Sequence, residues 1–158
     1  RDGTPLKKQI DLGTDKAGYY KPDKYDIYFY NGEAILAGEL APEGWKIPSD
    51  TDWEQLKNYT DNDTSILKAG EWQVMVSGEV VPVNNHTRFN AFPVGMWYNK
   101  SHNSPNKMTA FWSWDYTKHT LSESTFYFLG ESNEFVKSTA HVTGKPYYKA
   151  LSIRCIKE

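Results

Sequence analysis

Residues 40–50 read LAPEGWKIPSD and carry the clearest local signal in the chain. Ser49 precedes acidic residues, so its hydroxyl can cap a helix whose dipole favours those acids in the first turn. Trp53 and Leu56 lie three residues apart and therefore share one helical face. We predict a helix over residues 50–59, which the turn-forming sequence DND brings to an end.

Outward from this helix, β-prone segments alternate with turn and loop signals. A short helical turn is expected at 33–38 and a polar loop at 99–107. The closing segment 149–156 (KALSIRCI) alternates, which predicts a strand with Leu151, Ile153 and Cys155 buried. Further strands are predicted at residues 25–30 (YDIYFY), 71–83, 88–94, 108–115, 125–129 and 134–139, the last two forming a hairpin. Because helices do not alternate with strands, we expect an α+β fold with mostly antiparallel strands, one or two helices and long loops.

The chain has 158 residues, a length that suits one domain. Aromatic residues make up 15%, too many for a disordered chain. Residues 1–24 are rich in Lys, Asp, Gly and Pro and are expected to be a lead-in or edge segment, before a domain over 25–158. The net charge of −2 gives no sign of nucleic-acid binding. No apolar run approaches the roughly 20 residues of a membrane helix.

Five segments form an ordered set of motifs over residues 28–158. They are LAPEGWKIPSD with Trp53, Leu56 and Tyr59; Leu67 and Lys68 with Trp72; FNAFPVG at 89–95; FWSW at 111–114; and SIRCI at 152–156. This set resembles the Fibrobacter succinogenes major paralogous domain family, whose blocks include GFSALPGG, WWSST and SVRCV.

The resemblance implies a C-type-lectin-like fold, in which the closing strand pairs near the strand at 25–30. The motif PSDTDW at 48–53 and the closing Arg-Cys strand are also similar to the formylglycine-generating sulfatase-modifying fold, a relative of that fold. Family members are typically secreted or lipid-anchored surface proteins of Bacteroidetes-type bacteria. An extracellular or cell-surface location is therefore expected. The chain begins at Arg1 without a signal-peptide pattern, as expected of a mature product or a trimmed chain.

The chain departs from the family at two places. Many members have a cysteine just before the PEGW run, and the resemblance implies that it pairs with the cysteine of the closing strand. Ala41 occupies that position here, so Cys155 is expected to be a buried, reduced thiol. The family's N-terminal WMAENL block is not visible in residues 1–27.

The sequence gives little support for catalytic residues or a metal site. Cys155 is the single cysteine, which disfavours an enzyme of the formylglycine-generating type, since those enzymes use cysteine pairs. The four histidines, His86, His102, His119 and His141, lack the local spacing of a zinc site. Ser104 in the SPN sequence at 104–106 stands where calcium-dependent lectins have a carboxylate or amide. Calcium needs six to eight oxygen ligands, and Asp115 alone does not supply them. We expect no catalytic residues, no metal and no cofactor.

Aromatic residues are the remaining candidates for function. Four tryptophans at family-block positions, Trp45, Trp53, Trp72 and Trp112, are expected in the core. A ring beside amides and acids suits sugars or protein partners, because the ring stacks while polar groups orient the ligand. The predicted ligand-binding patch consists of Trp97, Tyr98, Asn99, Trp114, Asp115 and Tyr116. The alternative is that these residues are packed, since Trp112 and Trp114 share one strand face.

The sequence thus favours a non-enzymatic surface or secreted module that binds a glycan or a surface protein. A structural part of a larger surface assembly, such as a pilus-associated or multi-domain lipoprotein without a ligand pocket, is the first alternative. An enzyme of the formylglycine-generating type is the second. Exposure of the aromatic patch around one concavity would distinguish the first two.

Overall fold

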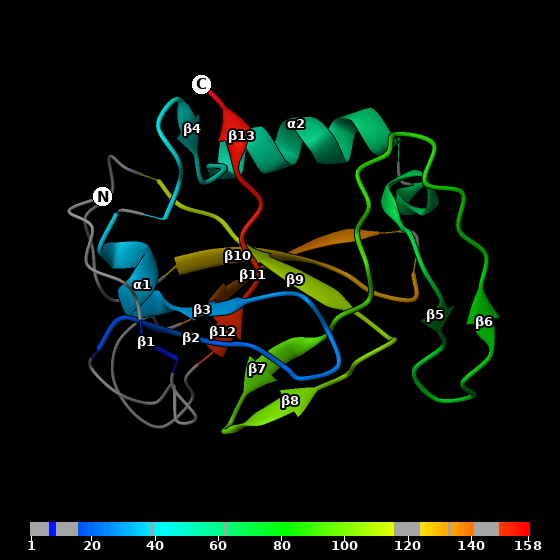
Figure 1. Ribbon diagram of the computed structural model, residues 1–158. Helices are drawn as coiled ribbons and strands as arrows, with labels where there is room; N and C mark the ends of the chain where they lie inside the picture. The colour runs from blue at the N-terminus through cyan, green and yellow to red at the C-terminus, as the bar shows by residue number, and fades with distance from the viewer. Residues whose placement is uncertain are drawn as a thin grey trace.

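Figure 1 shows the computed structural model, which describes residues 7–8, 16–38, 40–61, 63–115, 124–132, 134–140 and 149–158. Within these ranges the chain forms mostly antiparallel strands and few helices, as the sequence predicts. The helices are α1 (Gly32–Leu36), α2 (Asp50–Thr60) and the short 3-10 helix η1 (Thr64–Leu67). None of these helices has the length and apolar character needed to span a bilayer.

The largest sheet joins N-terminal strands of the described chain to β12 of the closing segment. Its six strands lie in the order β1-β2-β3-β12-β7-β8. They are β1 (Lys7–Lys8), β2 (Gly18–Tyr20), β3 (Phe29–Asn31), β12 (Lys149–Leu151), β7 (Met96–Tyr98) and β8 (Ser101–Asn103). β12 pairs antiparallel with β3 on one side and with β7 on the other. The expected pairing of the closing strand near residues 25–30 is therefore confirmed.

A second sheet lies beneath α2 in Figure 1. Its strands, in the order β11-β10-β9, are β11 (Phe135–Ala140), β10 (Ser124–Leu129) and β9 (Thr109–Trp112). The predicted hairpin of β10 and β11 is confirmed. In the part of the chain that the structure describes, two small ribbons remain: β4 (Trp45–Lys46) with β13 (Ile156–Lys157), and β5 (Trp72–Gln73) with β6 (Val80–Val81).

The closing segment links the two large sheets. Ser152 follows β12 and exchanges two backbone hydrogen bonds of 3.1 Å with β9, through Trp112 N and Ala110 O. The predicted uninterrupted strand over 149–156 is therefore wrong, because the chain leaves one sheet at Ser152 and joins β4 at Ile156. The expected alternation fails for the same reason: Ala150, Leu151 and Ser152 are all buried, whereas Cys155 is half-buried.

The predicted start and end of α2 are confirmed. Ser49 and Asp52 form a reciprocal capping box, in which Asp52 Oδ2 accepts from Ser49 N at 2.8 Å. Lys46 Nζ donates to the same oxygen at 2.8 Å. Burial opposes ionisation of this carboxyl, but the hydrogen bonds from Lys46 and Ser49 hold the pKa of Asp52 below its ordinary value. Asp61 ends the helix in the left-handed conformation.

Three other predictions need correction. The strand at 25–30 begins only at Phe29, because a turn closed by Tyr25 N and Pro22 O precedes it. Residues 88–94 form no strand, because Arg88 and Asn90 take positive φ angles that interrupt an extended backbone. Within this segment only Ala91 forms a β-bridge, with Lys68. The expected loop at 99–107 contains β8, because positive φ angles at Asn99 and Lys100 build a tight hairpin turn.

Among the described residues, three clusters of buried apolar side chains form the core. One packs around Trp53 and Trp72 between α2 and the second sheet. A second packs around Trp112, and a third around Phe29 on the largest sheet. The prediction of core tryptophans holds for these residues, but Trp45 is largely exposed on the small β4–β13 ribbon.

Candidate functional site

The two tryptophans of the predicted aromatic patch are buried in different clusters. Trp97 is 6% exposed and packs on Tyr20, with ring centroids 3.9 Å apart. Trp114 is 7% exposed in the cluster around Trp112, and its backbone N donates to Pro48 O at 2.9 Å. The expected exposure of these rings is therefore wrong, because Tyr20 covers Trp97 on β7 and the cluster around Trp112 covers Trp114 just after β9.

The remaining patch residues do not restore one surface. Asn99 is exposed in the β7–β8 turn, which lies at the lower edge of Figure 1. Tyr98 is half-buried, and Lys149 Nζ lies 5.8 Å from the centre of its ring. Asp115 is half-buried after β9, next to the residue that contacts Pro48 at the start of α2. Tyr116 lies outside the described residues, as do His119 and His141.

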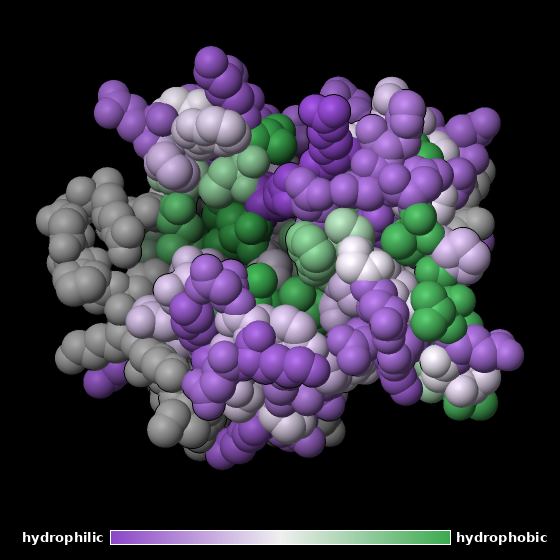
Figure 2. Space-filling model, turned by 45° about the vertical axis from the view of Figure 1, so that its right-hand side comes forward, coloured by the Kyte–Doolittle hydropathy of each residue, from purple (hydrophilic) through white to green (hydrophobic). Residues whose placement is uncertain are grey.

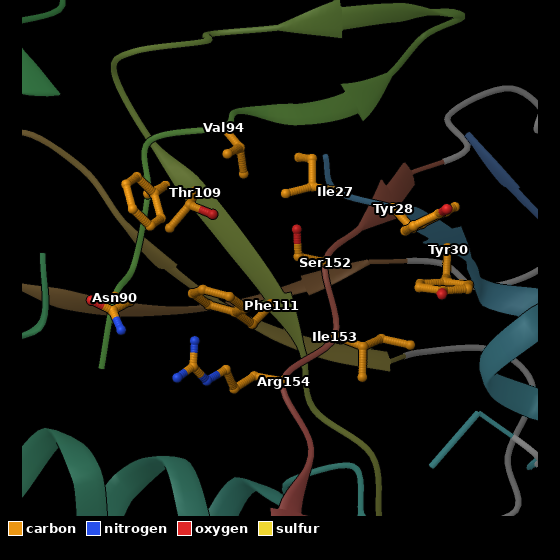
Figure 3. Close-up of a pocket in the computed structure, with 11 residues that line it drawn as sticks. Ile27, Tyr28, Tyr30, Asn90, Val94, Thr109, Phe111, Ser152, Ile153 and Arg154 are labelled. Carbon is orange, nitrogen blue, oxygen red and sulfur yellow. The ribbon is translucent and has the colours of Figure 1, made fainter. Parts of the chain in front are cut away.

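A different concavity lies where the closing segment meets β3 and β9. Its volume is about 260 Å³, close to the lower end of small-molecule pockets. Figure 3 shows how its residues surround the space. They are Ile27, Tyr28, Tyr30, Asn90, Phe92, Val94, Thr109, Phe111, Ser152, Ile153 and Arg154. We call this cavity the closing-segment pocket.

Two hydroxyl groups of this pocket have no hydrogen-bond partner among the described residues. They are Thr109 Oγ1 and Ser152 Oγ, on side chains whose residues are 1% and 9% exposed. Figure 3 shows both hydroxyls pointing toward the space below Val94. Leaving a buried polar group unpaired costs about 1–3 kcal/mol, so two of them in one cavity call for an explanation. The Ser124 hydroxyl on β10 is also unpaired, but it does not line this pocket.

Backbone contacts hold the two residues that carry these hydroxyls. Gly95 forms a parallel β-bridge with Thr109 and donates its N–H to Met108 O at 2.6 Å. These two contacts hold the start of β9. Gly95 has a φ of 75°, and a Cβ there would lie 2.2 Å from Asn103 O, so no other residue fits without a shift. Ser152 is held by its two backbone hydrogen bonds to β9.

Arg154 brings a positive charge to the same pocket. Its guanidinium is half-buried and lies 4.4 Å from the centre of the Phe89 ring. Burial lowers the pKa of Arg154. Among the described residues no carboxylate and no hydrogen-bond acceptor contacts this guanidinium.

Aromatic rings supply the remaining walls. Tyr28 is 40% exposed at the rim and stacks on Tyr30, with ring centroids 6.4 Å apart. Phe92 is half exposed, and Phe111 is buried deeper in the pocket. Asn90 lies in a left-handed turn, and its Oδ1 accepts from Asn85 Nδ2 at 2.6 Å. Its own Nδ2 is thereby left as a donor beside Arg154, at one end of the pocket in Figure 3.

A larger and more open hollow near η1 offers fewer free polar groups to a ligand. It has a volume of about 650 Å³, and its acids include Asp63 and Glu131. Both carboxylates are used locally, since Asp63 Oδ1 accepts from Ser65 N and Glu131 Oε2 accepts from Met75 N. Within the described ranges no three His, Cys, Asp or Glu residues gather as a metal site would require.

Sequence reasoning did not select Thr109, Ser152 or Arg154 as site residues. Arg154 and Ser152 share one face of the alternating segment KALSIRCI, opposite its apolar face, and that polar pair was the available signal. The pocket also draws residues from three of the family motifs, FNAFPVG, FWSW and SIRCI, which the fold brings together.

Comparison with protein families gives a match over nearly the whole chain. The model of the Fibrobacter succinogenes major domain matches residues 2–157. The chain belongs to this family. The comparisons with curated proteins and with solved structures found no match. The resemblance noted in the sequence is therefore confirmed, and the match includes the segments that build the closing-segment pocket.

Proposed function

We propose that this Fibrobacter succinogenes major domain is a non-enzymatic binding module of a bacterial cell surface or secreted protein, and that the closing-segment pocket holds part of a glycan. The observation that carries the proposal is the pair of unpaired hydroxyls, Thr109 and Ser152, inside a cavity walled by aromatic rings. Sugars present hydroxyls and an apolar ring face at once, and such a pocket offers partners to both.

The pocket size supports a terminal sugar unit rather than a long chain. A volume of about 260 Å³ suits a small group, while the exposed rim residues Tyr28 and Phe92 can contact the units that follow. The fold is proposed to be C-type-lectin-like, which the pairing of β12 with β3 supports.

A glycan array with the purified protein tests this function. We expect retention of a limited set of glycans, followed by a loss of affinity of about tenfold or more for Phe92→Ala, which removes an exposed ring of the pocket. Tyr59→Ala is the matched control, because Tyr59 is an exposed ring on α2 outside the pocket. Failure to retain any glycan, or equal affinity of Phe92→Ala and wild type, would overturn the proposal.

One observation favours the alternative of a structural part in a larger surface assembly. The β5–β6 ribbon exposes Met75 and Val76 in its turn and Val80 at the start of β6, and Val76 is 96% exposed. Figure 2 shows apolar residues gathered on the right of its view, where this ribbon comes forward. If this alternative is correct, Val76→Asp will abolish association with the rest of the assembly while Phe92→Ala has no effect.

The enzyme alternative finds no support at Cys155. Burial raises the pKa of this thiol, whereas a reactive cysteine needs a lowered pKa to form the thiolate.

A further inference from the structure

We propose that the glycan unit held in the closing-segment pocket is acidic, and that Arg154 binds its carboxylate. This inference rests on the proposed function and names the class of sugar that the pocket selects. It follows from three features of the pocket: its charge, its hydrogen-bond donors and the spatial order of its groups.

The charge of the pocket is positive and uncompensated. Arg154 is the one charged residue among the eleven that line the described cavity. A half-buried cation without an opposite charge has lost hydration and regained only the Phe89 ring contact at 4.4 Å. A ligand carboxylate would supply the missing partner in a site with no competing acid.

The donors fit a carboxylate in particular. A guanidinium presents parallel N–H groups that match the two oxygens of a carboxylate. Asn90 adds an amide donor at the same end, because its Oδ1 is already occupied by Asn85 Nδ2. Neither group offers a free acceptor that would repel an anion.

The order of groups along the pocket matches an acidic sugar. Figure 3 shows the Arg154 guanidinium at one end, the Phe111 ring in the middle, and the Thr109 and Ser152 hydroxyls beyond it. A sugar acid bound in this direction would place its carboxylate on Arg154, its ring face on Phe111 and its hydroxyls on Thr109 and Ser152. A neutral sugar would leave the guanidinium unpaired.

Pairs of sugars that differ only in this group provide the test. Glucuronate and glucose, galacturonate and galactose, and mannuronate and mannose are each titrated into the full chain and followed by NMR chemical shifts. We expect at least one acid to bind about tenfold or more tightly than its neutral parent. Arg154→Gln should bring the acid to the affinity of the parent, and Arg154→Lys should keep part of the preference.

Arg88→Gln is the matched control. Arg88 is exposed, precedes Phe89 and does not line the pocket. Its replacement by Gln therefore removes one positive charge, as Arg154→Gln does, without changing a pocket residue. Far-UV circular dichroism verifies that each variant is folded, and Arg154→Lys carries the test if Arg154→Gln does not fold. Equal loss of the acid preference in Arg88→Gln would overturn the inference in favour of general charge attraction.

The remaining outcomes separate the two proposals. If neutral sugars bind as tightly as their acids, and Phe92→Ala weakens both, the proposed function stands and the acidic ligand is refuted. If neither the panel nor the glycan array gives binding, both proposals fail. If acids alone bind and Arg154→Gln removes that binding, both stand.

Discussion

The contacts of α2 with the sheet of β9, β10 and β11, which we call the helix side, pair their polar groups, whereas several groups at the closing-segment pocket are unpaired. Away from the pocket, the Ser124 hydroxyl on β10 is the exception in that sheet. Asp50 of α2 accepts from the Ser113 hydroxyl and pairs with Lys137 at 2.9 Å. Glu54, also on α2, accepts from the Tyr127 hydroxyl at 2.8 Å. On the pocket side, Ser152 and Arg154 have no such partner among the described residues.

This difference appears along a single strand. Thr109, at the start of β9, carries an unpaired hydroxyl, and Ser113, just after its end, carries a paired one. Unpaired buried groups are rare in folded proteins and expensive in free energy. Two of the three such hydroxyls among the described residues line one cavity, which indicates that the helix side provides stability and that the pocket side is built to contact something else.

The largest expected effect comes from the aromatic centre of the helix side. Trp53 is buried against Phe111, Tyr127 and Phe135, with ring centroids 5.5 to 5.8 Å away. Trp53→Ala should therefore lower the free energy of unfolding by about 3–5 kcal/mol, measured by urea denaturation. Tyr28→Ala, which removes a ring at the pocket rim, should cost less than about 1 kcal/mol. Similar losses for both would mean that the two sides do not differ in this way.

A buried lysine near α2 sharpens the comparison, because its charged group is buried with a single hydrogen bond and no carboxylate partner at hydrogen-bond distance among the described residues. Lys68 is 0% exposed, and its Nζ has one hydrogen bond, to Ser132 O at 2.8 Å, beside the Trp72 ring. Burial lowers the pKa of Lys68 to about 8, from 10.5. The unfolded chain therefore binds more protons between these pH values, so stability should rise with pH, by up to about 3 kcal/mol between pH 8 and 10.5.

Urea denaturation across this pH range measures the effect of Lys68. Tyrosines and other lysines titrate in the same interval, so the informative quantity is the difference between the wild type and Lys68→Met. We expect the wild type to gain on the variant as the pH rises from about 8. Parallel curves for the two proteins would show that Lys68 keeps its ordinary pKa in the fold.

A smaller effect is expected from one paired hydroxyl of the helix side. Ser113 is buried and donates to Asp50 Oδ1. Ser113→Ala deprives this carboxylate of a donor and should lower the free energy of unfolding by about 1–2 kcal/mol. The measurement is again urea denaturation, with Ser77→Ala on the exposed β5–β6 turn as a control for the substitution itself. A loss no larger than in that control would contradict the prediction.

Local signals and the family resemblance account for the parts of the fold that could be predicted. The helix α2 follows from Ser49, its acidic first turn and the DND stop, all within a few residues. The β10–β11 hairpin is likewise local, and the pairing of β12 with β3 follows from the resemblance. These features need no knowledge of how distant segments meet.

The candidate site could not be predicted because it depends on such meetings. Arg154, Asn90 and Tyr30 come from three distant segments, and the polar pair of Ser152 and Arg154 does not by itself indicate which segments meet it. Alternation also predicts the wrong burial at Ser152, where the chain changes sheets and three consecutive residues are buried. Trp97 and Trp114 were expected at a surface, but Tyr20 and the cluster around Trp112 cover them.

The smallest expected effect gives the sharpest form of the comparison. Ser152→Ala is the same substitution as Ser113→Ala at another buried serine, but the Ser152 hydroxyl has no partner to lose. Removing it also removes the cost of burying an unpaired group, so the free energy of unfolding should change by no more than about 0.5 kcal/mol or should increase. Both variants are compared by urea denaturation in the same buffer without sugar. A loss as large as that of Ser113→Ala would mean that the Ser152 hydroxyl is satisfied in the free protein, and the pocket would then lack the unmet polar groups that distinguish it from the helix side.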